Sequence, residues 1–166
     1  MSRVLVIGYG NPMRGDDGVG GHVAQTLDRH IHDDPGGRVI GSHQLTPEMA
    51  EDVAASEFVL FLDAAAGPAP GTIEIANLEP QPEGASFSHH LSPAMLLSAA
   101  LELYGSAPRA QLLTIIGASF ELGEALSPGI AQQMPALFNQ AVAIIESSRG
   151  LTVRDTVSRA AQAPRP

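Results

Sequence analysis

One stretch of the sequence constrains the fold more than any other. Positions 58–62 are five consecutive apolar residues, and Asp63 follows them directly. A strand with one face in water alternates apolar and polar residues, so an unbroken apolar run of this length indicates a strand that is buried on both faces. Such strands belong to parallel sheets that helices cover on both sides. We therefore expect the chain to fold around a sheet of this kind.

Strands and helices are expected to alternate along most of the chain. The apolar and turn-forming residues predict strands at 4–7, 38–41, 57–63, 72–77 and 111–117, and helices at 17–30, 47–55, 93–104 and 128–148. Residues 72–77 alternate between apolar and polar types, as an edge strand does. This order predicts an α/β fold, with a mostly parallel sheet and helices on both faces.

Three of the expected helices share a start signal, a hydroxyl residue followed by proline. The hydroxyl can accept a hydrogen bond from a free N–H at the helix start, and proline is tolerated at the first helical position. The three pairs are Thr46-Pro47, Ser92-Pro93 and Ser127-Pro128. Gly105 is well placed to end the second of these helices, and Pro135 should kink the third or delay its start.

The length of 166 residues fits one domain. We assign residues 1–149 to it and expect residues 150–166, which are polar and end in Ala-Pro-Arg-Pro, to be a flexible tail.

Acidic residues outnumber basic ones by 18 to 9, which argues against a nucleic-acid partner because phosphates need basic side chains to neutralise them. Every apolar run is shorter than a membrane span or a signal peptide requires. We therefore expect a cytoplasmic protein that does not bind membranes.

The chemistry open to the chain is limited by two missing residue types. The sequence has no cysteine, and all nine basic residues are arginine. A P-loop needs a lysine, and a thiol protease or a zinc–thiolate site needs cysteine. Catalysis or metal binding therefore has to use carboxylates, imidazoles, hydroxyls and the backbone.

Carboxylates follow the first and third expected strands. Asp16 and Asp17 stand side by side after the first strand, and Asp63 ends the third. One acid of the adjacent pair is expected to cap the following helix, but two adjacent carboxylates repel each other, and a cation would relieve that repulsion. Asp63 taken alone also fits a turn aspartate. In a parallel sheet, however, both groups lie at the edge where the carboxyl ends of the strands meet, which is where ligands bind.

His89 and His90 form a second candidate group, in a loop just before a capped helix. Neutral imidazole is a common metal ligand, and a pair beside a helix start is a better candidate than a lone histidine. Two carboxylates and an imidazole suit a borderline divalent metal such as nickel, zinc, iron or manganese. We assign no role to the remaining histidines, which are His22, His30, His32 and His43. This assignment is least certain for His43, which comes just before an expected helix cap.

The glycine-rich turn after the first strand leaves other functions open. Gly8-Tyr9-Gly10 matches the start of a dinucleotide-binding fingerprint, but Met13 stands where the third glycine belongs. A nucleotide-binding or partner-binding module without catalytic activity is one alternative. A second alternative is a metallo-hydrolase that carries its own zinc and cuts small peptides.

Four groups of residues resemble the motifs of the [NiFe]-hydrogenase maturation endopeptidases. The longest is Val6-Ile7-Gly8-Tyr9-Gly10-Asn11-Pro12-Met13-Arg14-Gly15-Asp16-Asp17-Gly18-Val19-Gly20, which is similar to the N-terminal signature of that family. The others are Phe61–Ala64 with Pro70–Thr72, Ser88–Ser92, and Ile116–Ala118 with Gly123–Ser127. The similarity extends over about residues 4–148, nearly the whole expected domain.

This resemblance implies a fold and an activity. The fold would be a five-stranded twisted sheet of the phosphorylase/hydrolase-like type, with helices on both faces. The activity would be metal-dependent removal of a short C-terminal extension from the large-subunit precursor of a [NiFe] hydrogenase, after nickel has been inserted. Nickel, or another divalent metal in its place, would be carried by that precursor. The metal would serve as a recognition element, polarise the scissile carbonyl or activate water.

The residues that the resemblance assigns to nickel and to catalysis are Asp17, Asp63 and His89. Asp17 stands where the family often has glutamate, which is one methylene longer. His90 is the alternative to His89, which fits better the family's pattern of a small residue, histidine, any residue and a hydrophobic residue. Asp16 would then support a neighbouring ligand or cap the helix.

Overall fold

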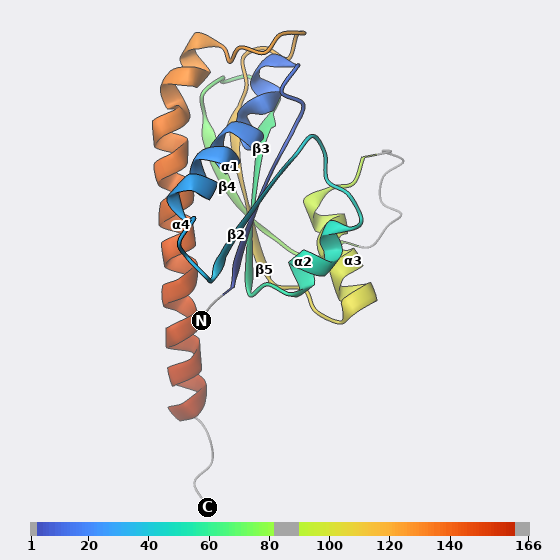
Figure 1. Ribbon diagram of the computed structural model, residues 1–166, viewed down its shortest axis with the longest axis vertical. Helices are drawn as coiled ribbons and strands as arrows, with labels where there is room; N and C mark the ends of the chain where they lie inside the picture. The colour runs from blue at the N-terminus through green and yellow to red at the C-terminus, as the bar shows by residue number, and fades with distance from the viewer. Residues whose placement is uncertain (1–2, 82–89, 162–166) are drawn as a thin grey trace, which may run out of the picture.

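The computed structural model describes residues 3–81 and 90–161, with side chains in the second range described as far as residue 150. Its strands are β1 (Val4–Tyr9), β2 (Gly37–Ser42), β3 (Phe58–Ala65), β4 (Ile73–Leu78) and β5 (Arg109–Ile116). Its helices are α1 (Val19–His30), α2 (Met49–Ala54), α3 (Pro93–Tyr104) and α4 (Pro128–Ala161), with a short 3-10 helix, η1 (Gly15–Gly18), before α1. The elements follow one another in the expected order (Figure 1).

The sheet has five strands in the order β2-β1-β3-β5-β4. β1 is parallel to β2 and β3, and β3 is parallel to β5, whereas β4 pairs antiparallel with β5 at one edge. The prediction of a five-stranded, mostly parallel sheet is therefore confirmed. β3 lies between β1 and β5, and residues 58–62 are all buried, so the apolar run is covered on both faces as expected.

Helices cover both faces of the sheet. α1 and α4 pack on one face, and α2 and α3 pack on the other (Figure 1). Alternate residues of β1 enter the two apolar layers, so that Val4 and Val6 face α1 and α4 while Leu5 and Ile7 face α2 and α3. Burial of apolar surface in these layers is the main favourable term in folding.

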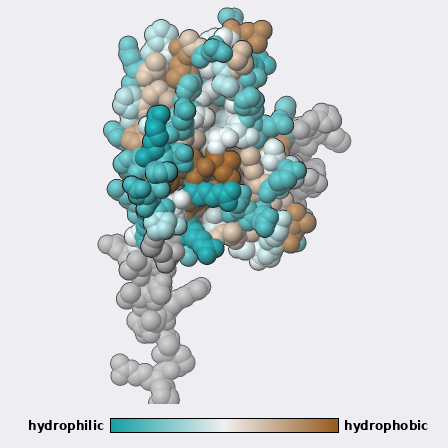
Figure 2. Space-filling model, viewed as in Figure 1, coloured by the Kyte–Doolittle hydropathy of each residue, from teal (hydrophilic) through white to brown (hydrophobic). Residues whose placement is uncertain are grey.

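On the face of the molecule shown in Figure 2, hydrophilic side chains predominate and hydrophobic ones form separate patches.

Two glycines allow α1 to approach the sheet closely. A Cβ at Gly8 in β1 would lie 2.1 Å from the backbone oxygen of Gly20 in α1. A Cβ at Gly20 would lie 2.5 Å from the backbone oxygens of Tyr9 and Leu62. Any side chain at either position would collide with backbone. The close fit of α1 on β1 and β3 therefore offsets the low helix propensity of its glycine-rich start.

The helix α3 begins and ends as its sequence predicts. The Ser92 hydroxyl accepts a hydrogen bond from the Met95 N–H at 3.2 Å, and Pro93 occupies the first turn. Gly105 ends the helix in the left-handed region, with φ of 74°. A residue with a side chain is disfavoured in that region, so glycine is suited to this position.

The helix start that Thr46-Pro47 predicts for α2 is wrong in detail. α2 begins at Met49, two residues after Pro47, and no side chain caps it. The Met49 N–H instead bonds to the carbonyl of Thr46 at 3.1 Å, in a turn that comes before the helix. The third start signal places α4 correctly at Pro128, but the Ser127 hydroxyl donates to another side chain, described below.

The last helix is longer than expected. α4 runs from Pro128 to Ala161 with Pro135 inside it, so this proline does not delay the helix start. The expected helix end at 148 is also wrong, because the helix continues through residues 150–161 of the segment expected to be a tail.

The assignment of residues 1–149 to one domain stays a prediction. Among the described residues, no helix combines the length and the apolar character that a membrane span needs.

Candidate active site

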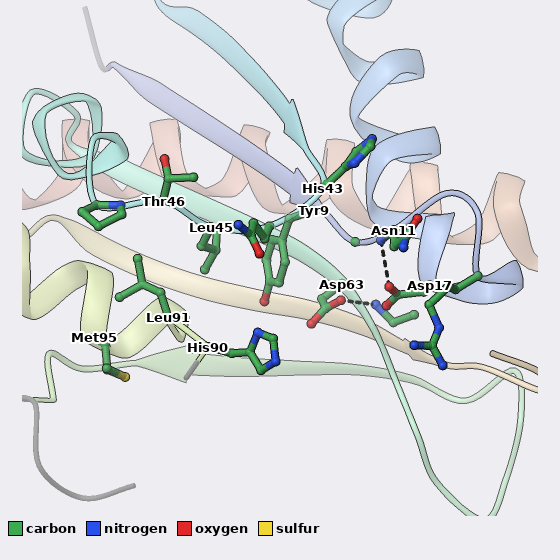
Figure 3. A pocket seen from close by; sticks show the side chains of 15 residues that line it. Tyr9, Asn11, Asp17, His43, Leu45, Thr46, Asp63, His90, Leu91 and Met95 are labelled. Atoms are coloured by element: carbon green, nitrogen blue, oxygen red, sulfur yellow. Dashed lines mark hydrogen bonds between the residues drawn. The ribbon is translucent and has the colours of Figure 1, made fainter. Parts of the chain in front are cut away.

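The connections of β1 create a natural binding position in the sheet. From β1 the chain passes over one face through α1 to β2, and then returns over the other face through α2 to β3 on the opposite side of β1. After β3 the chain goes to β4 at the opposite edge of the sheet, so the loops after β1 and β3 lead away from each other. Ligands of open α/β sheets bind at such a point, outside the carboxyl ends of the strands. A cleft of about 780 Å³ lies there (Figure 3).

Asp63 lies on the wall of this cleft, near the end of β3. Its carboxylate accepts a hydrogen bond from the Ala64 N–H at 2.8 Å and has the Tyr9 hydroxyl as a second partner. Burial raises the pKa of Asp63 to about 6, and the negative charge of Asp17 adds to the rise, whereas the bonds to Tyr9 and Ala64 act in the opposite direction. The group is thus an acid that can gain or lose a proton close to neutral pH.

Asp17 reaches the same cleft from the loop after β1. Its carboxylate accepts a hydrogen bond from the Asn11 N–H at 2.7 Å (Figure 3). The loop folds back tightly over Gly10, which has φ of 136° and where a Cβ would lie 1.9 Å from the backbone oxygen of Asp17. Only glycine fits there, so Gly10 is required by packing within the loop. The expectation that the two carboxylates lie at one edge of the sheet is confirmed by the parallel pairing of β1 with β3.

Tyr9 is a residue of the cleft that the sequence pattern did not single out. It follows Gly8 at the end of β1, and the register that pairs Gly8 with Leu62 brings Tyr9 beside Asp63. Burial, together with the charge of Asp63, raises the pKa of the Tyr9 hydroxyl above its usual range. The hydroxyl is therefore neutral at all ordinary pH values and can donate a hydrogen bond. The parallel register was the signal that could have revealed it.

Asp16 has a different role from its neighbour. Its side chain is fully buried and accepts hydrogen bonds from the backbone N–H groups of Ala118 (2.7 Å), Ser119 (2.9 Å) and Ser127 (2.8 Å), and from the Ser127 hydroxyl (2.8 Å). Burial by itself raises the pKa of Asp16, but these bonds outweigh it and hold the pKa below the usual value. Asp16 thus ties the loop after β1 to residues 118–127.

The expectation that one of the adjacent acids caps the following helix is wrong. Gly18 stands at the cap position of α1, and no side chain hydrogen bond caps either η1 or α1. The reason is that Asp16 is turned toward the distant segment 118–127, while Asp17 is turned toward the cleft. Asp16 is not among the residues that line the cleft.

The histidine candidates are placed only in part. His89 lies outside the described residues. His90 is described, is exposed, and lines the same cleft as Asp63 (Figure 3). His43, which was assigned no role, also lines the cleft, from the loop after β2. Within residues 3–81 and 90–150, whose side chains the structure describes, no three His, Asp or Glu side chains are close enough together to hold a metal ion.

The cleft is polar at one end and apolar at the other. Asp17 and Asp63 lie at the polar end, and Leu45, Leu91 and Met95 line the other end (Figure 3). Such a cleft can bind a chain that carries a cationic group and an apolar side chain close together, because each end offers a matching surface. The acids can bind a metal or exchange a proton with a bound molecule.

Comparisons with solved structures find this fold among proteases that mature hydrogenases. The hydrogenase maturating endopeptidase HybD from E. coli is 25% identical, with a TM-score of 0.69 over 88% of this chain and 93% of the other. The [NiFe] hydrogenase maturation protease HycI from Thermococcus kodakarensis is 26% identical, with a TM-score of 0.68 over 87% and 93%. A hydrogenase 2 maturation peptidase from a Thaumarchaeota archaeon is 27% identical, with a TM-score of 0.59 over 90% and 99%. No model of a protein family matches the chain, and no curated protein matches its sequence.

Proposed function

We propose that this chain, which belongs to the [NiFe]-hydrogenase maturation endopeptidases, removes a C-terminal extension from the precursor of a hydrogenase large subunit. Three solved structures that share its fold over most of both chains are maturation proteases of hydrogenases. The observation that carries the proposal is the meeting of Asp17 and Asp63, which come from separate motifs and line one cleft at the carboxyl ends of β1 and β3.

Nickel enters this proposal as part of the substrate. Asp17 and Asp63 carry negative charges that repel each other, and this repulsion contributes to the raised pKa of Asp63. A cation brought by the precursor would relieve the repulsion, so a precursor loaded with nickel would bind better than one without it. His89 remains the proposed third contact, with His90 as its alternative. The metal then reports that the precursor is fully assembled.

The residues of the cleft suggest how the peptide bond is cut. Hydrolysis adds water to the scissile carbonyl carbon and breaks the C–N bond, and the released amine takes up a proton. Asp63, with a pKa of about 6, is mostly charged at pH 7 and is suited to accept a proton from that water. The Tyr9 hydroxyl holds the carboxylate of Asp63 in place. A divalent metal beside them can polarise the carbonyl or lower the pKa of water.

The proposal is tested by incubating the purified protein with nickel-loaded and nickel-free precursor and following the mass of the large subunit. We expect cleavage of the loaded form only, and equal cleavage of both forms would rule out recognition through nickel.

Asp17→Asn and Asp63→Asn should abolish cleavage, whereas Asp28→Asn, a substitution at an exposed position of α1, should not. His89→Ala should abolish it too, and loss with His90→Ala alone would exchange their roles. A stoichiometric zinc in the purified protein would instead favour a metallo-hydrolase with its own metal.

A further inference from the structure

A second hollow adjoins the cleft. It has a volume of about 270 Å³ and shares two lining residues with the cleft, Gly10 and His43. Its remaining walls come from the start of α1 and the end of β2. His43 therefore stands between two adjoining hollows at the same edge of the sheet, one on each side of it.

Two glycines on the walls of this hollow are not required by the fold. A Cβ at Gly21 in α1 or at Gly41 in β2 would have no atom within 4 Å, and neither residue has a positive φ. They differ in this from Gly20, the neighbour of Gly21, whose Cβ would collide with backbone. Glycine weakens a helix or strand relative to alanine. Their common effect is to keep the hollow open.

The hollow differs from the cleft in charge. Among the residues that the structure describes, no acidic one lines it, whereas Asp17 and Asp63 line the cleft. Exposed side chains of His22 and Gln25 stand on its wall together with His43, and they offer both hydrogen-bond donors and acceptors. Most of the remaining surface of the hollow is apolar, so these polar groups can bond to the N–H and C=O groups of an extended peptide while its side chains contact the apolar part. The carboxylates that match a metal cation lie in the neighbouring cleft.

We propose that this hollow holds the C-terminal extension of the precursor while the metal-bearing part of the precursor occupies the acidic cleft. An endopeptidase cuts inside a chain, so it has to hold the substrate on both sides of the scissile bond. The two hollows meet at Gly10 and His43, and the substrate chain crosses there. This inference rests on the proposed function, and it adds where the extension binds.

The first test fills the hollow by substitution. Gly21→Leu places a side chain into it, and Gly150→Leu is the matched control, because a Cβ at Gly150 in α4 also has no atom within 4 Å. We expect both variants to keep or raise the Tm of the wild type. Gly21→Leu should lower kcat/KM for the nickel-loaded precursor at least tenfold, and Gly150→Leu should leave it unchanged. Equal kcat/KM values for a folded Gly21→Leu and the wild type would refute the subsite, whereas an inactive wild type would refute the proposed function itself.

The second test blocks the hollow chemically on an otherwise unchanged protein. Because the natural chain has no cysteine, Gln25→Cys introduces a single thiol on the wall of the hollow, and Gln140→Cys introduces one on the exposed surface of α4. Each purified variant is treated with a bulky maleimide, and excess reagent is removed before the precursor is added. Labelling should abolish processing by Gln25→Cys and leave Gln140→Cys active. Full activity of labelled Gln25→Cys would contradict binding of the extension here.

Discussion

Replacing Asp16 with asparagine should destabilise the protein by about 3 kcal/mol although no group that lines the cleft is changed. One carboxylate oxygen of Asp16 accepts bonds from Ala118 N–H, Ser119 N–H and the Ser127 hydroxyl, and the other accepts from Ser127 N–H. Asparagine has a single acceptor oxygen, so at least one buried donor loses its partner, at a cost of about 1–3 kcal/mol. The remaining bonds lose the help of the charge, which adds about 1–2 kcal/mol.

Thermal unfolding measured by circular dichroism tests this magnitude. For a chain of this size, about 3 kcal/mol corresponds to a decrease in Tm of about 6–12 °C. Asp28→Asn makes the same chemical change at an exposed position of α1 and should alter stability by less than about 0.5 kcal/mol. If Asp16→Asn lowers the Tm no more than this control does, then the four hydrogen bonds of Asp16 contribute far less than their geometry implies.

The pKa of Asp16 is lowered in the folded protein, so the stability that its charge contributes is present above the unfolded pKa of ~3.9 and is lost as the pH falls through the folded value. The difference in Tm between wild type and Asp16→Asn should therefore narrow below about pH 4, and a constant difference would contradict this. Tyr9→Phe removes a bond that lowers the pKa of Asp63, so an NMR titration should give a value above about 6, and an unchanged value would show that the hydroxyl does not act on this carboxylate. Gly20→Ala should cost about 1–3 kcal/mol because its Cβ meets backbone oxygens at 2.5 Å, whereas Gly21→Ala, next to it in α1, should keep or raise the Tm; equal effects in thermal melts would refute the packing role of Gly20.

The sheet and the meeting of two carboxylates were predictable because both depend on short-range patterns. An apolar run at 58–62 indicates a strand buried on both faces, and parallel pairing then brings the acids after β1 and β3 to one edge. The end of α4 was missed for a physical reason. The composition of residues 150–166 favours a tail, but extending a helix that has already formed costs far less than starting a new one, and α4 continues to Ala161.

The division of roles between Asp16 and Asp17 was not predictable from the residues near them. Either acid could cap a helix or face a ligand, and the choice depends on hydrogen-bond donors 102 to 111 positions later in the chain. A distant partner also explains the Ser127 signal, whereas the Thr46 signal differs because of a local turn. Each fits a helix cap locally, but a turn takes the place of one and the carboxylate of Asp16 engages the other.

The contrast between the two adjacent acids also bears on the proposed contact with nickel carried by the precursor. The charge of Asp16 is already balanced by four donors in the interior, so it needs no further partner. Among the described residues, Asp17 and Asp63 have fewer donors, and burial, together with a smaller effect of the charge of Asp17, keeps the pKa of Asp63 high. Because Asp16 fixes the loop that carries Asp17, the protein holds this unbalanced pair in position before any substrate binds. A metal carried by the precursor would then find its two carboxylates already placed, and little binding energy would be lost in ordering them.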